Sequence, residues 1–282
     1  MRFYAILPII GYILCGCGSY VPELNEWPNE GTQADKRMIQ QIIRSIDCEL
    51  SYVVTKIIED DLEKAGKRVS GRTYTDFLAN WGAEVAINLT VIERSGVNPT
   101  IAAFPETNPF ALLSVSGGFS ASTEATRLEK INVFYTVREL FRPGDSRCVP
   151  GDGNKFGSPL VDSDLKLFPL LDGRIGAATL GFARVPDAKF TLTGSKNVLS
   201  HTVSFKILTA GAVTPSLRLV RATLNPAGNL ISAGRDRTHE LVITFGPLDN
   251  AAGKRSLIPI AENAHQNSQL QTGIRALSFP FQ

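Results

Sequence analysis

The hydrophobic residues follow a helical spacing early in the chain. From about Ala34 to Lys64 they recur at steps of three and four, so they line one face of a helix. Thr32 can cap this helix and Gly66 can end it. A stripe this wide covers a sheet, pairs with another helix or lies on a bilayer, and the scarcity of basic residues on the polar face disfavours the bilayer. The apolar positions are Met38, Ile39, Ile42, Ile43, Ile46, Leu50, Val53, Val54, Ile57, Ile58 and Leu62.

From Trp81 the spacing changes to two, which predicts strands with one buried face. Short strands joined by short turns favour an antiparallel meander. Residues 120–126 are small and polar and follow Gly117-Gly118, so we predict a bulged or mobile connection there. The predicted strands of this region are 85–92, 100–104, 110–119 and 129–138.

Alternation returns in the last third of the chain. Before it, residues 165–171 predict a short helix that Pro169 limits, and one strand is predicted near 189–192. A second short helix is predicted around 262–271. The strands predicted here are 201–208, one that starts at Leu217, and 241–245.

The two β regions resemble each other, which indicates an internal duplication. Each contains a strand, a turn with glycine and proline, a second strand, and a closing strand preceded by an arginine. Arg127 and Arg237 are 110 positions apart, and the same shift aligns the alternating positions of the closing strands. Pro99 and Pro215 are 116 positions apart, so the copies differ in length between these points. The alternative is that glycine–proline turns look alike in any meander.

The beginning of the chain has the anatomy of an export signal. Arg2 gives a positive start, and residues 3–14 form an apolar run too short for a comfortable membrane span of about 20 residues. Leu14-Cys15-Gly16-Cys17 resembles the lipobox of bacterial lipoproteins. The resemblance implies cleavage before Cys17, lipid on its thiol and amine and, with Gly18 next, a place in the outer membrane facing the periplasm. An ordinary signal peptide and an uncleaved N-terminal helix are the alternatives.

These features divide the chain into five segments. They are a lipoprotein signal peptide (1–16), a flexible tether (17–33), a helix plus first β-meander (34–142), a connector rich in glycine and proline with a short helix (143–197), and a second β-meander with a C-terminal tail (198–282). We expect an α+β fold in which a long N-terminal amphipathic helix packs on duplicated antiparallel β-meanders.

The order of elements in residues 34–137 is also similar to that of a known family. A helix, a strand, a turn with glycine and proline, a strand, a serine-rich connection and a closing strand resemble the small trypsin-co-occurring domains of bacterial conflict systems. The second β region has only a short helix candidate and departs from this pattern. The resemblance implies architecture and no activity.

Composition and charge narrow the function classes. The chain has 282 residues, 43% hydrophobic and 20% charged, which is typical of globular proteins. A formal net charge of +2 gives no basic footprint for nucleic acid. The basic pairs Lys67-Arg68 and Arg235 with Arg237 are interpreted as solvated surface.

Cys48 and Cys148 are the cysteines that remain once the signal is removed and Cys17 carries lipid. Two thiols in an exported, oxidising compartment predict one disulfide. It would close a loop of about 100 residues, which the chain-entropy model values at about 4–5 kcal/mol. The alternative is that both are small buried hydrophobes.

The residues that carry chemistry form no recognisable motif. The three histidines, His201, His239 and His265, are not spaced as a metal site requires, and no nucleophile elbow is present. His239 could approach His201 if their strands pair, although a polar surface pair is the simpler interpretation. The acidic groups 59–61 and Asp162 with Asp164 are interpreted as surface acid. We therefore predict no catalytic residue, no metal site and no cofactor.

The sequence favours a membrane-anchored envelope lipoprotein that acts as a non-catalytic binding or scaffolding subunit. Its expected contacts are the membrane, through lipid on Cys17, and an envelope protein partner, with no nucleic acid. The alternative is an envelope enzyme, a hydrolase whose site forms only in the fold. A deep pocket that gathers His201, His239 and carboxylates would favour the enzyme. A flat apolar patch or an exposed strand edge would favour the binding subunit.

Overall fold

The computed structural model describes about two thirds of the chain, in ranges separated by several internal gaps. The described residues are 21–22, 24, 32–69, 71, 73–103, 115–144, 165–179, 198–218, 222–225, 229–253 and 255–277. The predicted signal, Cys17, Cys148 and the strand near 189–192 lie outside them, as does much of the tether and the connector. In the part that the structure describes, no helix is both long and apolar enough to cross a membrane.

Helix α2 (Thr32–Lys67) confirms the predicted amphipathic helix with nearly the predicted bounds. Most of its apolar stripe is buried, and Ile42, Ile46 and Leu50 are at most 1% exposed, whereas Leu62 near its end is 52% exposed. Two short helices, α3 (Val137–Leu140) and α5 (Leu167–Thr179), pack against it. The Ser51 hydroxyl donates a hydrogen bond of 2.7 Å to the carbonyl oxygen of Leu140, which ties α2 to α3. Helix α5 begins within the region where a short helix was predicted.

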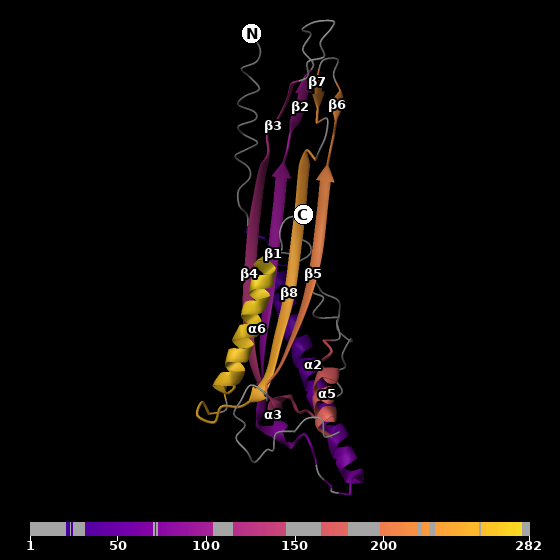
Figure 1. The fold of residues 1–282 in the computed structure, drawn as a ribbon, viewed down its shortest axis with the longest axis vertical. Helices are drawn as coiled ribbons and strands as arrows, with labels where there is room; N and C mark the ends of the chain where they lie inside the picture. The colour runs from indigo at the N-terminus through magenta and orange to yellow at the C-terminus, as the bar shows by residue number, and fades with distance from the viewer. Residues whose placement is uncertain are drawn as a thin grey trace. The chain divides into compact units, whose positions relative to one another are not determined.

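The strands in the described ranges form two four-stranded sheets (Figure 1). The first, which we call the long sheet, has the order β4-β1-β8-β5, and the second, the short sheet, has the order β3-β2-β7-β6. Together with the helices, these antiparallel sheets confirm the predicted α+β class. The strands are β1 (Trp81–Val97), β2 (Thr100–Ala103), β3 (Val115–Gly118), β4 (Ala121–Thr136), β5 (Leu199–Val213), β6 (Leu217–Arg218), β7 (Ala222–Leu224) and β8 (Ile231–Pro247).

One predicted connection is a strand instead. Residues 120–126 were predicted as a bulged or mobile link, but β4 already begins at Ala121. One of the small polar side chains is paired across to β1: the hydroxyls of Ser95 and Thr123 share a hydrogen bond of 2.7 Å. Threonine is a good strand former, and its hydroxyl finds a partner on the neighbouring strand. Small polar composition was therefore a misleading sign of a loop.

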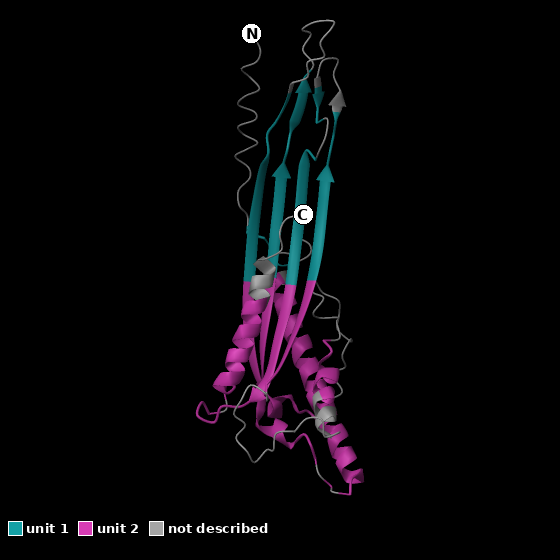
Figure 2. Cartoon of the chain, viewed as in Figure 1, with its two compact units in different colours: residues 1–24, 90–128, 206–238 teal, residues 25–89, 129–205, 239–282 magenta. Residues whose placement is uncertain are grey.

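The chain forms two compact units (Figure 2). Unit 1 consists of residues 1–24, 90–128 and 206–238, and unit 2 of residues 25–89, 129–205 and 239–282. Each unit takes residues from both β regions, so the units cut across the predicted segments 34–142 and 198–282. The long strands contribute residues to both units, whereas the described helices, including α6 (Pro259–Leu277) and the 3₁₀ helix η2 (Asp76–Asn80), all belong to unit 2.

In unit 2, the inner strands β1 and β8 are buried on both faces. Residues 241–246 of β8 are all buried, so neighbouring side chains on opposite faces are covered alike. Figure 1 shows α6 on one side of these strands and α2 on the other. Helix α6 approaches closely at Gly246, where an added Cβ would lie 2.7 Å from the Cβ of Ala261. The helix predicted around 262–271 is the central part of α6.

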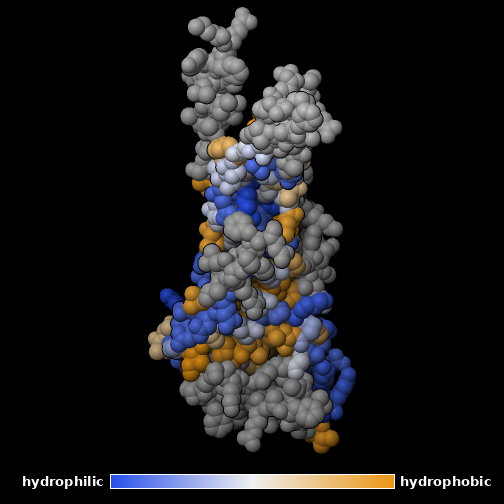
Figure 3. All heavy atoms as spheres, turned by 45° about the horizontal axis from the view of Figure 1, so that its top comes forward, coloured by the Kyte–Doolittle hydropathy of each residue, from blue (hydrophilic) through white to orange (hydrophobic). Residues whose placement is uncertain are grey.

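In unit 1, the strands are far more exposed. Residues 208–213 of β5 are exposed without interruption, and large apolar side chains such as Leu128, Leu208 and Ile231 are about half exposed or more. Figure 3 shows hydrophobic residues at the surface beside hydrophilic ones. Exposed apolar side chains of this kind are typical of surfaces that bind another protein.

Candidate functional site on the long sheet

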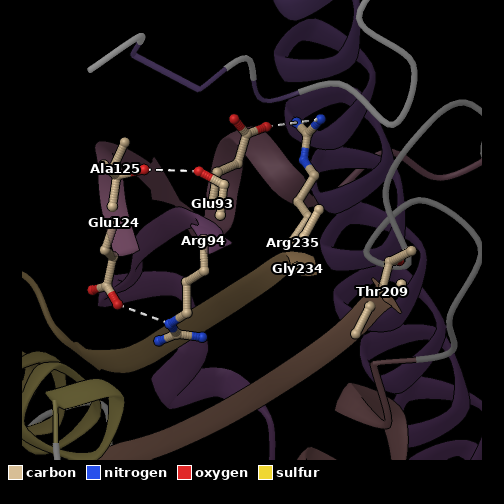
Figure 4. Close-up of a pocket in the computed structure, with 12 residues that line it drawn as sticks. Glu93, Arg94, Glu124, Ala125, Thr209, Gly234 and Arg235 are labelled. Carbon is tan, nitrogen blue, oxygen red and sulfur yellow. Dashed lines mark hydrogen bonds and ion pairs between the residues drawn. The ribbon is translucent and has the colours of Figure 1, made fainter. Parts of the chain in front are cut away.

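Unit 1 contains a hollow of about 530 Å³ that all four strands of the long sheet line (Figure 4). Each strand contributes three consecutive residues: 93–95 from β1, 123–125 from β4, 209–211 from β5 and 233–235 from β8. The charged side chains come from β1, β4 and β8, whereas β5 contributes only Thr209, Ala210 and Gly211. The hollow is therefore charged on β1, β4 and β8 and lined by small residues on β5.

Two ion pairs cross the strands at this hollow. The Nε of Arg94 donates to Oε2 of Glu124 at 2.8 Å, joining β1 to β4. The Nη1 of Arg235 on β8 lies 3.3 Å from Oε1 of Glu93 on β1. The first pair is almost half exposed, at 46% and 44%, and exposed pairs of this kind add little stability. Because each charge has a counter-charge, the hollow offers a polar surface without a net field for one sign of ligand.

Arg235 and Arg237 correct one prediction. They were interpreted as solvated surface, but the side chain of Arg235 is only 18% exposed and Arg237 is 5% exposed. The reason is that β8 is an inner strand of the long sheet, so its neighbours cover both residues. Sequence reasoning also missed Glu93 and Arg94 as lining residues. Two adjacent opposite charges at the end of an apolar strand were the available signal.

A second polar cluster lies inside unit 2, where α6 meets β8 and β5. The Nε2 amide of Gln269 donates to Nε2 of His265 at 2.8 Å, and Nδ1 of His265 donates to the Thr244 hydroxyl at 2.9 Å. The Thr244 hydroxyl continues to Ser200 at 3.4 Å, and the hydroxyls of Ser200 and Ser268 are 3.0 Å apart. His265 and Thr244 are both 0% exposed. This chain of donors requires a neutral imidazole, because a protonated ring could not accept from Gln269.

Burial sets the protonation of this cluster. Desolvation lowers the pKa of His265 to about 4. Nearby Glu84, whose Oε1 lies 4.0 Å from His265 Nε2, has its pKa raised by burial and by the charge of Glu262. At neutral pH the imidazole is uncharged and satisfied by neutral partners, as expected for a histidine that holds a helix on a sheet.

The other predicted residues do not gather into a site. His201 Nε2 hydrogen-bonds with the carbonyl oxygen of Leu165 at 2.8 Å, and His239 is buried in β8, the strand next to that of His201. Cys48 lies half-buried within α2, and the disulfide to Cys148 stays a prediction because Cys148 is outside the described residues. Over the described ranges, no group of three or more histidine, cysteine or acidic residues could hold a metal ion.

No protein-family model matches this sequence, and no curated protein is similar to it at a significant level. Solved structures of the Salmonella SPI-1 type III secretion injectisome secretin InvG align with 68% of this chain. The open-gate structure has 12% identity and a TM-score of 0.13, and 66% of its chain is covered. The near-atomic-resolution structure has 10% identity and a TM-score of 0.14, and 71% of its chain is covered. Similarity this low carries no information on the fold or function of this chain.

Proposed function

We propose that this protein is a non-catalytic binding or scaffolding subunit, held at the bacterial envelope by lipid on Cys17. The observation that carries the proposal is the state of the long sheet. Its outer strands, β4 and β5, each have one neighbour, so each leaves a row of backbone donors and acceptors with no partner strand in the described part of the chain. Such edges are templates for adding a strand from another protein.

The chemistry of the hollow supports binding over catalysis. Its charged groups are arginines and carboxylates in crossed pairs, and its β5 wall is threonine, alanine and glycine. A general base or nucleophile works through a pKa matched to its task and a partner that orients it. A wall of paired charges and small residues suits a polar contact surface. The lipid anchor on Cys17 would keep this surface close to the membrane.

The test is fractionation and affinity isolation from detergent-solubilised envelopes, with the protein expressed from its own promoter. Wild type is compared with Cys17→Ser, and Cys15→Ser serves as the matched control because it keeps a small residue before the cleavage site. We expect wild type and Cys15→Ser to stay in the membrane with a stoichiometric partner or as a stable assembly. Cys17→Ser is expected to become soluble. Equal fractionation of all three would refute the anchor, and an anchored protein that is always a lone monomer would refute the binding role.

A further inference from the structure

The structure aligns the two β regions strand by strand. Strands β4 and β8 begin at positions 110 apart, Ala121 and Ile231, and β1 and β5 end at positions 116 apart, Val97 and Val213. These are the two shifts found in the sequence. The hollow follows the same rule: residues 93–95 correspond to 209–211, and residues 123–125 correspond to 233–235. Strands β1, β2, β3 and β4 are therefore the equivalents of β5, β6, β7 and β8.

Inside one chain, the two equivalent β regions are joined in the same way in both sheets. In the long sheet, β1 of the first copy pairs with β8 of the second, and in the short sheet β2 pairs with β7. Replacing each strand by its equivalent turns the β1–β8 junction into a β5–β4 junction, and the β2–β7 junction into a β6–β3 junction. These four strands are the outer strands of the two sheets. The two outer strands of each sheet are therefore equivalent to the two strands that pair where the β regions meet inside one chain, and they can pair with each other in the same way.

The register of such a junction follows from the one inside the chain. The amide of Asn98 donates to the carbonyl oxygen of Leu230 at 2.8 Å, and Gly96 lies beside Ser232. Shifting the β1 positions by 116 and the β8 positions by 110 places Ser204 of β5 opposite Lys130 of β4. In this register Val203 is opposite Ile131, a β-branched pair that favours antiparallel pairing.

The two outer strands carry few of the features that block edge pairing. Strands β4 and β5 are 16 and 15 residues long, and neither contains proline. Short length, proline and outward lysine are common protections of an edge. The lysine of β5, Lys206, is in an ion pair of 2.9 Å with Asp236 of the neighbouring strand, and Arg127 of β4 donates to the carbonyl oxygen of Pro22. Lys206 is therefore compensated by a counter-charge, and Lys130 of β4 is the exposed lysine of this edge.

We propose that the partner of this sheet is a second copy of the same chain, which pairs its β4 with β5 of the first and its β3 with β6. The proposal rests on the proposed binding function and names its partner. The contact is head-to-tail, because each chain presents its β4 edge to one neighbour and its β5 edge to the other. Contacts of this type extend to further copies and end in a closed ring or an open filament.

Cysteine cross-linking tests the proposal directly. Two full-length single variants, Ser204→Cys and Lys130→Cys, are co-expressed and oxidised, and covalent dimers are measured on non-reducing gels. Both side chains are exposed, and directly opposite residues in an antiparallel pair have Cα atoms about 4.5–5.5 Å apart, a separation that a disulfide can span. Within one chain the two edges are three strand spacings apart, about 14 Å in total. The control replaces Ser204→Cys by Ser200→Cys, which is shifted by four residues on the same face.

We expect a dimer from the Ser204→Cys and Lys130→Cys mixture at least tenfold above the register-shifted control and above protein with only its natural cysteines. Neither single variant should cross-link with itself, because a head-to-tail contact never brings a position against its own copy. Self-cross-linking of either variant, or no cross-link in the mixture, would overturn the inference. If the mixture gives no cross-link while wild type still isolates a different stoichiometric partner, the second-copy inference fails and the binding function stands.

Discussion

The buried histidine of α6 gives the sharpest prediction about stability. His265 is neutral in the folded protein because burial lowers its pKa to about 4, whereas an unfolded histidine has a pKa of about 6.5. Below pH 6.5, His265 binds a proton in the unfolded chain but stays neutral in the folded chain. The stability contributed by His265 is therefore complete above about pH 7 and is lost as the pH falls from 6.5 towards 4.

The magnitude follows from the two pKa values. At pH 5 the unfolded ring is almost fully protonated and the folded ring is almost fully neutral, which predicts a loss of about 1–2 kcal/mol relative to pH 8. Glu84 opposes this loss, because its raised pKa lets the folded state bind a proton that the unfolded state has released. The effect of His265 is therefore best measured as a difference between wild type and a variant.

The assay is urea unfolding followed by circular dichroism at several pH values from 8 to 5. His265→Asn keeps an amide donor for Thr244 and removes the titration, so its stability should fall less than that of wild type over this range. Glu84→Gln removes the opposing group and should steepen the loss. If His265→Asn loses as much stability as wild type between pH 8 and pH 5, the ring is not held neutral by burial and the reasoning is wrong.

Two further substitutions test the packing of unit 2. Gly246→Ala should destabilise the protein by about 1–3 kcal/mol in the same urea assay, because the new methyl group would overlap Ala261 of α6. Gly211→Ala is the control and should be nearly neutral, because no atom lies within 4 Å of its added Cβ. Equal effects of the two substitutions would contradict this packing. Asp61 was interpreted as surface acid, but the structure buries it at 3% exposed. Asp61→Asn should cost about 2–4 kcal/mol, because the buried carboxylate accepts several hydrogen bonds that outweigh desolvation and lower its pKa. The matched change Asp60→Asn, in an i,i+4 ion pair, should have a much smaller effect in thermal unfolding, and a comparable loss would refute the role of Asp61.

The sequence predicted where helices and strands lie along the chain better than it predicted which strands pair. Spacing at three and four located α2, and alternation located parts of β1, β5 and β8. The alternation predicted one buried face, but in unit 2 both faces of β1 and β8 are buried, because α2 and α6 lie on opposite sides of these strands. Both patterns concern only the faces of an element. They do not report which strand lies beside it. Nothing local indicates that β1 pairs with β8 from the far end of the chain, so the burial of Arg237 was missed. His265 was missed for the same reason: its burial depends on α6 meeting Thr244, a tertiary contact with no signal in the sequence.

The duplication preserved the framework of the long sheet while the side chains of the hollow diverged. Arg94 and Glu124 form an ion pair in the first copy, and their equivalents in the second are Ala210 and Gly234. The backbone order of the two copies is therefore shared, but at this level the first copy carries three charged residues and the second carries one, Arg235. If two chains join β5 to β4, the more charged and the less charged β regions alternate around the assembly. The duplication therefore kept the strand pairing that such an assembly needs, whereas the charged side chains of the two copies came to differ.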